Sequence, residues 1–378
     1  MALDLQQIQK SEEDKPIENK FSFKKLLQLS EQVTTISAKD KQFFVQNLQV
    51  MSRSGLPLDR SLKTLADQTV NKRFKKIINT LYHDTEKGVA FQDSLAKFKS
   101  TFGELFINMV EAGSISGKLD DVLAQIYLQI KKGNELKSRI RGAMTYPVIV
   151  LIAMVLIGIG MLIFVIPKIT GLFDQMSADL PFATKLLINT SDFIINNGIL
   201  SALVVIGICV GFISFIRSTG GKYIFHGFIL NLPIFGSIIK KINLAKFART
   251  LSSLIKTDIP IVKTFEVTSK VLNNRHYRKA LIDSSVKLKE GATIAQTLSA
   301  YPKLFPPVII QMISTGEETG QVDNILGELA SFYEDEIDQI MKTLPSIIEP
   351  VLMVVLGVGV AIMAIAIIMP MYSLTQQF

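Results

Sequence analysis

The 378-residue sequence contains no tryptophan, three histidines and a single cysteine, Cys209. One cysteine excludes an internal disulfide scaffold and a cysteine-rich metal site. The histidines, His83, His226 and His276, lie far apart in the sequence and lack the spacing of metal ligands. The sequence therefore offers no catalytic, metal or cofactor-binding residues, and we predict a protein that is not an enzyme.

Charged residues are missing from three long stretches, which lie between Arg141 and Lys168, between Asp192 and Arg217, and after Glu349. About 20 apolar residues are enough to cross a hydrocarbon core of about 30 Å. The three predicted transmembrane helices cover residues 142–167, 199–216 and 346–372. Because no Asp, Glu, Lys, Arg or His occurs in the charge-free stretches, a proton relay or an ion path is disfavoured.

The charges that are present have an uneven distribution. Segment 41–141 carries 17 Lys and Arg against 10 Asp and Glu, and segment 217–343 carries 16 against 12. Segment 168–198 carries two Lys against three Asp. Because basic segments stay in the cytoplasm, we expect the N-terminus inside and segment 168–198 outside. No basic cluster is interleaved with aromatic residues, so the net charge of +8 does not indicate a nucleic-acid partner.

The chain contains an internal repeat. Residues 44–167 align with residues 247–370 at a constant offset of 203 without a gap. Matched pairs along this alignment are Phe44 and Phe247, Pro57 and Pro260, Gly88 and Gly291, Asp120 and Asp323, and Pro147 and Pro350. The middle span has no counterpart, because its role is to return the chain to the side on which both copies begin.

Apolar residues recur at helical spacing in both copies, as at Phe44, Leu48 and Met51. We therefore predict an all-α, polytopic membrane protein with two repeated cytoplasmic helical-bundle domains of roughly six short helices each. The predicted organisation is a cytoplasmic tail over 1–40, a first bundle over 41–141, an external loop over 168–198, an amphipathic connector over 217–243 and a second bundle over 244–345.

A glycine-containing corner occurs once in each copy. The two sequences are Gly113-Ser-Ile-Ser-Gly117-Lys-Leu-Asp120 and Gly316-Glu-Glu-Thr-Gly320-Gln-Val-Asp323. Two glycines permit a tight turn between helices, Ser116 or Thr319 is expected to cap the following helix, and the aspartates suit its first turn. The corner is either a purely structural connection or a docking surface. It is not a phosphate-binding P-loop, which needs four residues between its glycines.

Two further patterns have alternative interpretations. The acidic run from Glu334 to Asp338 is typical of a solvated helix face and less so of a cation site. Gly207 and Gly211 fit a small-xxx-small helix-packing face in the second span, a motif that is also common by chance.

Several segments resemble a known family. The second corner, continued to Leu326, resembles the recurring Gly-Glu-x-x-Gly-x-Leu motif of the type II secretion F-domain proteins, with Val322 in place of leucine. Segment 139–147, with Tyr146 and Pro147, is similar to the first-span signature of that family, and Glu349-Pro350 to the start of its last span. The resemblance covers about residues 40–372. Ser114 departs from it, because the family motif usually has glutamate there.

The resemblance implies a non-enzymatic platform in the inner membrane, of the kind found in type II secretion and type IV pilus machines. Such a platform couples a cytoplasmic ATPase to pilin or pseudopilin subunits, contacts other assembly proteins and the lipid bilayer, and forms a homo-oligomer. The candidate docking or turn residues are then Gly113, Gly117, Asp120, Gly316, Glu317, Gly320 and Asp323. The alternative from another class is a small membrane transporter subunit.

Overall fold

The computed structural model describes residues 35–168, 170, 182–233 and 235–375, and all the regular secondary structure in these residues is helical. The all-α prediction is therefore confirmed for the described part of the chain. The chain divides into two compact units, of which one ends at Thr101 and the other begins at Phe102. Most of the predicted tail 1–40 and part of the predicted loop 168–198 lie outside the described residues.

The first unit is built from short helices. They are α2 (Ala38–Arg53), α3 (Leu58–Gln68), α4 (Lys72–Glu86), α5 (Phe91–Ala96) and α6 (Lys99–Phe102). Ser37 begins α2 with a capping box, in which its hydroxyl accepts the Asp40 N–H and the Asp40 carboxylate accepts the Ser37 N–H. Phe44 of α2 packs edge-on against Phe74 of α4, with 5.5 Å between the ring centroids, in a core that excludes solvent.

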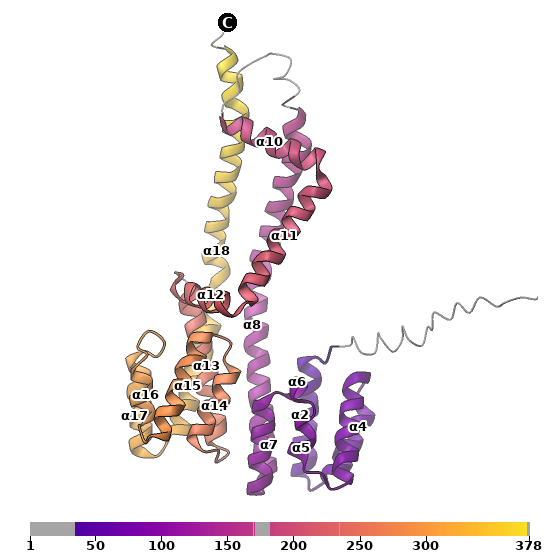
Figure 1. The fold of residues 1–378 in the computed structure, drawn as a ribbon, viewed down its shortest axis with the longest axis vertical. Helices are drawn as coiled ribbons and strands as arrows, with labels where there is room; N and C mark the ends of the chain where they lie inside the picture. The colour runs from indigo at the N-terminus through magenta and orange to yellow at the C-terminus, as the bar shows by residue number, and fades with distance from the viewer. Residues whose placement is uncertain (1–34, 169, 171–181, 234, 376–378) are drawn as a thin grey trace, which may run out of the picture. The chain divides into compact units, whose positions relative to one another are not determined.

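The second unit contains the remaining helices, and Figure 1 labels the α-helices among them. They are α7 (Glu104–Ser116), α8 (Leu119–Gly160), the π-helix η1 (Met161–Val165), α10 (Phe182–Asn196), α11 (Gly198–Arg217), α12 (Thr219–Asn231), α13 (Phe235–Ile255), α14 (Ile261–Val271), α15 (Arg275–Lys289), α16 (Ile294–Ser299), α17 (Pro307–Thr319) and α18 (Val322–Thr375).

Four buried rings form the centre of the second bundle. Phe247 packs edge-on against Phe265 and Phe305, and Tyr277 packs against Phe305 at 5.5 Å between centroids. The Tyr277 hydroxyl donates to the Leu304 carbonyl at 2.9 Å, so this buried polar group is satisfied. Burial also raises the pKa of the Tyr277 phenol far above its usual range.

Three helices in the described residues are long and apolar enough to cross a membrane, and they belong to α8, α11 and α18. The middle helix agrees closely with the predicted span 199–216. The other two differ from the prediction, because α8 and α18 begin in the bundles and continue into the apolar stretches without interruption. The expected boundaries at 141/142 and 345/346 therefore mark changes of polarity along a helix and not the ends of elements.

Two predicted connecting segments contain helices. The predicted external loop 168–198 includes α10, and the predicted connector 217–243 comprises α12 and the first part of α13. The connector was predicted to end at residue 243, but α13 continues through this position without a break. Phe193 and Ile195 of α10 and Phe235 of α13 are exposed apolar residues, as expected for helices that lie beside a membrane.

Candidate docking site at the repeated glycine corners

The second glycine of each corner is the turn residue. Gly117 and Gly320 follow α7 and α17 with φ of 70° and 69°, in the left-handed region that favours glycine. The next residue in each copy returns its N–H to the first glycine, as Lys118 does to the Gly113 carbonyl at 3.0 Å. The two corners are therefore built alike, as the repeat predicts.

The first glycine of each corner has a different task from the one predicted. Gly113 and Gly316 are buried inside α7 and α17, and neither has a positive φ. A Cβ at Gly316 would lie 3.1 Å from the Cα of Val322, where α18 begins. Gly113 and Gly316 permit the close approach of two helices, whereas Gly117 and Gly320 form the turn.

The predicted caps at Ser116 and Thr319 are wrong. The Ser116 hydroxyl donates to the Ala112 carbonyl at 2.8 Å, and the Thr319 hydroxyl donates to the Thr315 carbonyl at 2.7 Å. Both hydroxyls thus bond back into the preceding helix, because the left-handed glycine turns the chain away before the next helix begins. Asp120 and Asp323 do lie in the first turns of α8 and α18.

Glu317 has an internal role in the second bundle. Its carboxylate accepts the N–H groups of Ile294 and Ala295, the latter at 3.0 Å, and so caps the N-terminus of α16. Ser114, at the matching position in the first copy, is too short to provide two such bonds. Glu317 of the second corner therefore connects α17 to the N-terminus of α16.

The first corner lies against a turn of the second copy. The Lys118 ammonium is 3.0 Å from the Asp258 carboxylate, and a hollow of about 330 Å³ opens beside this pair. Its lining includes Glu111 and Ile115 of α7 and Ile259 and Lys263 of the second copy. The exposed Ile115 side chain gives this hollow an apolar surface that a partner's apolar group can contact.

Asp258 is the one non-glycine residue with positive φ in the described chain, at 58°. It aligns with Gly55 of the first copy, whose φ is 76°. The sequence thus signals this turn through the repeat offset, although Asp258 was not among the predicted site residues. Aspartate tolerates the left-handed conformation, so Asp258 can replace the glycine of the first copy at this turn. Unlike that glycine, it has a carboxylate that pairs with Lys118.

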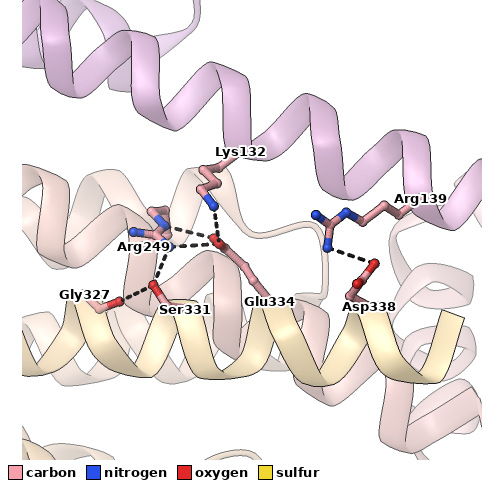
Figure 2. Close-up of polar contacts among 7 residues, drawn as sticks. All are labelled: Lys132, Arg139, Arg249, Gly327, Ser331, Glu334 and Asp338. Carbon is pink, nitrogen blue, oxygen red and sulfur yellow. Dashed lines mark hydrogen bonds and ion pairs between the residues drawn. The ribbon is translucent and has the colours of Figure 1, made fainter. Parts of the chain in front are cut away.

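The acidic run of α18 forms an ion-pair strip, defined as Glu334 and Asp338 with the basic residues that contact them. Figure 2 shows Lys132 and Arg139 of α8 pointing toward Glu334 and Asp338. Arg249 of α13 donates twice to Glu334, at 2.9 Å each, and Arg139 is 2.9 Å from Asp338. The strip therefore joins the two long helices of the two copies to α13.

The expectation of a solvated acidic face is wrong for these residues. The Glu334 side chain is only 14% exposed, and its charge is balanced by Arg249 and by Lys132 at 3.6 Å. Hydrogen bonding to Lys342, with the nearby Arg139, holds the pKa of Asp338 below its usual range. The Asp338 contribution to stability is consequently present at neutral pH and is lost as the pH falls into the acid range.

The predicted membrane-entry residues lie within continuous helices. Pro147 is buried inside α8 next to the exposed Tyr146, and Glu349 and Pro350 are exposed inside α18. A proline in a helix interior removes one backbone hydrogen bond and bends the helix. Both prolines therefore mark a weakened turn at the level where each helix becomes apolar.

Gly207 and Gly211 lie on α11, and no atom of the described chain comes within 4 Å of a Cβ built at either one. These two glycines therefore do not mediate helix packing within the described part of a single chain. Their packing role stays a prediction for contacts with other molecules.

Comparison with known proteins identifies the family. The family model for type II secretion system protein F matches the chain twice, over residues 44–167 and 247–370. These segments coincide with the repeat predicted from the sequence. This chain belongs to the type II secretion F family.

Relatives of the F-family chain come from both kinds of machine. It is 35% identical to the type IV pilus assembly protein PilC of Myxococcus xanthus over 343 residues, which is 90% of this chain and 81% of the relative. It is 32% identical to PilC of Thermus thermophilus over 89% of this chain and 82% of the relative. It is 28% identical to type II secretion system protein F of Pseudomonas aeruginosa over 90% and 84%, respectively.

Family membership and the three apolar helices together make this F-family chain an inner-membrane component of a secretion or pilus machine. Proteins of this family are structural membrane proteins and not enzymes. In the ion-pair strip, Glu334 and Asp338 belong to the acidic run that the sequence shows, whereas their basic partners on α8 and α13 were not predicted.

Proposed function

We propose that this protein is the platform of a type II secretion or type IV pilus machine and couples a cytoplasmic ATPase to the polymerisation of pilin or pseudopilin subunits. The observation that supports this most is the continuity of α8 and α18, each of which runs from a helical bundle into an apolar stretch as one helix. A partner that moves a bundle would thereby move two spans directly.

The ion-pair strip supports the same function. It connects α8 to α18 on the bundle side of both prolines, through residues separated by about two hundred positions in the sequence. A force applied to either copy is therefore shared by the other before it reaches the membrane. We further propose that the ATPase contacts the surface positioned by the second corner, from Gly316 to Asp323, as well as the hollow beside Lys118 and Asp258 at the first corner. The Gly207 and Gly211 face of α11 packs against other membrane helices, including those of a second molecule of this chain.

The proposed orientation is an N-terminus in the cytoplasm with both bundles on the same side and residues 168–198 outside. Alkaline phosphatase fused after Asn189 should be active, because this enzyme requires an external location, and the same enzyme fused after Lys289 should be inactive. The charge distribution described above is the physical reason. Equal phosphatase activities for the two fusions, at equal expression, would contradict this orientation.

Replacing Gly320 with valine tests the proposed function. A left-handed conformation costs a residue with a Cβ about 1–2 kcal/mol, so the substitution should distort the second corner while the spans stay intact. We expect normal insertion into the membrane, loss of filament assembly or secretion, and weaker co-purification of the ATPase.

The matched control is Gly320→Asn, because asparagine tolerates the left-handed region and this variant should retain activity.

A complete deletion of the gene separates the platform from the transporter alternative. Normal filaments and normal secretion in the deletion strain, together with a defect in solute uptake, would reject the platform function.

A further inference from the structure

Helix α12 exposes an apolar face directly beside the end of a predicted span. Only Ser218 separates it from α11, and the Ser218 hydroxyl accepts the Gly221 N–H at 3.0 Å to begin the new helix. The side chains of Ile224 and Phe228, one helical turn apart, are 64% and 61% exposed. With 13 residues, α12 is about 20 Å long, which is too short to cross a bilayer.

The opposite face of α12 is fixed to the second bundle. His226 accepts the backbone N–H of Arg275 on its Nδ1 at 3.2 Å, at the first residue of α15. His276 Nε2 lies 3.2 Å from the Tyr223 carbonyl, and the two rings are 4.2 Å apart. Gly227 permits this close approach, since a Cβ there would lie 3.0 Å from the His276 ring. The exposed face of α12 is therefore held in one orientation by the bundle.

The surroundings of this helix are positively charged. The sequence contains no acidic residue between Asp192 and Asp258, whereas it contains seven basic residues in that interval. Lys222 on α12 and Arg275 and Arg278 at the start of α15 lie close enough to His226 to act on its charge. Burial, together with these three cations and His276, lowers the pKa of His226, so the imidazole stays neutral and keeps its bond to Arg275.

An exposed apolar stripe on a helix with lysine and arginine nearby, at the point where a span leaves the bilayer, is the arrangement that binds a membrane surface. We propose that α12 and the N-terminal end of α15 form a binding surface for the headgroups of anionic phospholipids in the bilayer that α11 crosses. Ile224 and Phe228 enter the boundary between headgroups and acyl chains, and Lys222 and Arg278 contact the phosphates. The surface anchors the second bundle to the membrane independently of α18. It requires only that α11 crosses the bilayer, and it does not depend on the proposed coupling to an ATPase.

The absence of tryptophan allows a direct test, because one introduced indole gives the only tryptophan fluorescence of the chain. Full-length Phe228→Trp protein is reconstituted into phosphatidylcholine vesicles with and without phosphatidylglycerol. We expect shallow brominated lipids to quench its emission, and quenching to increase with phosphatidylglycerol. The comparison variants are Phe332→Trp, at an exposed bundle position of α18, and Ile208→Trp, at an exposed position in the middle of α11.

The charge dependence is tested in the same Phe228→Trp background. Replacing Lys222 and Arg278 with glutamine should abolish the effect of phosphatidylglycerol, whereas replacing Lys287 and Lys289, at the other end of α15, should leave it unchanged. Emission like that of Phe332→Trp in both vesicle types would overturn the proposal, as would deep quenching like that of Ile208→Trp. Persistence of the phosphatidylglycerol effect after removal of Lys222 and Arg278 would also overturn it.

Discussion

Replacement of Glu334 with glutamine is expected to destabilise the second unit more than the loss of any exposed ion pair within it. The carboxylate accepts two bonds from Arg249 at 2.9 Å and lies 3.6 Å from Lys132. Without the negative charge, two cations face each other in a site where Arg249 is only 13% exposed. Removing one partner of a buried ion pair costs about 3–5 kcal/mol, and we expect the lower end because both side chains retain some exposure.

Thermal unfolding of the full-length protein in detergent, followed by helical circular dichroism, measures this effect. The control is Lys342→Gln, since Lys342 is 73% exposed and pairs with Asp338 across one helical turn. An exposed pair contributes about 0–1 kcal/mol, so the unfolding temperature of the control should hardly change. Equal unfolding temperatures for Glu334→Gln and Lys342→Gln would show that the ion pairs of Glu334 do not stabilise the bundle.

A double-mutant cycle separates the pair itself from the effect of an unpaired charge. Arg249→Met combined with Glu334→Gln removes both partners, and the double variant should lose less stability than the sum of the two single variants. Strict additivity would mean that Arg249 and Glu334 act independently, despite their two short hydrogen bonds.

Replacement of Gly316 with valine is expected to have the second largest effect. A Cβ at this position would lie 3.1 Å from the Cα of Val322 and 3.2 Å from the Cδ1 of Ile325. The backbone atom cannot move without displacing the start of α18, so the two helices must separate. Overpacking of a close contact costs about 1–3 kcal/mol, and the same thermal unfolding measurement should show a clear decrease.

Gly133 provides a matched control, because it is also a helix-interior glycine but a Cβ added there would have no atom within 4 Å. Valine forms a helix slightly better than glycine, so Gly133→Val should be neutral or slightly stabilising. A decrease in unfolding temperature of the same size for both variants would indicate that the close contact at Gly316 is unimportant.

The sequence predicted those features that depend on neighbouring residues or on a fixed repeat. The apolar stretches, the helical spacing around Phe44 and the presence of a tight turn at each glycine corner follow from local patterns and agree with the structure, although only Gly117 and Gly320 have a positive φ. The offset between the copies also agrees with the two matched family segments. Such signals are readable because one stretch of chain determines each of them.

The contacts that the sequence does not reveal join residues that are distant along the chain. Arg249 and Glu334 are 85 residues apart, and nothing in the acidic run indicates that α13 and α8 approach it. The capping of α16 by Glu317 likewise depends on how α16 and α17 pack together. A sequence pattern shows that a carboxylate is present, whereas only packing decides whether it faces water, a cation or a helix terminus.

The prolines at the membrane level are expected to determine where the long helices bend under load. Pro147 and Pro350 each remove a backbone hydrogen bond from a helix that is otherwise continuous, and they occupy the same position in the two copies. On the bundle side of both, the ion-pair strip stiffens the assembly. A torque applied to the bundle should therefore bend each helix at its proline-containing turn, which is at Pro147 in α8 and over residues 345–350 in α18, where Pro345 is a further proline. The two spans would then tilt together instead of twisting one past the other.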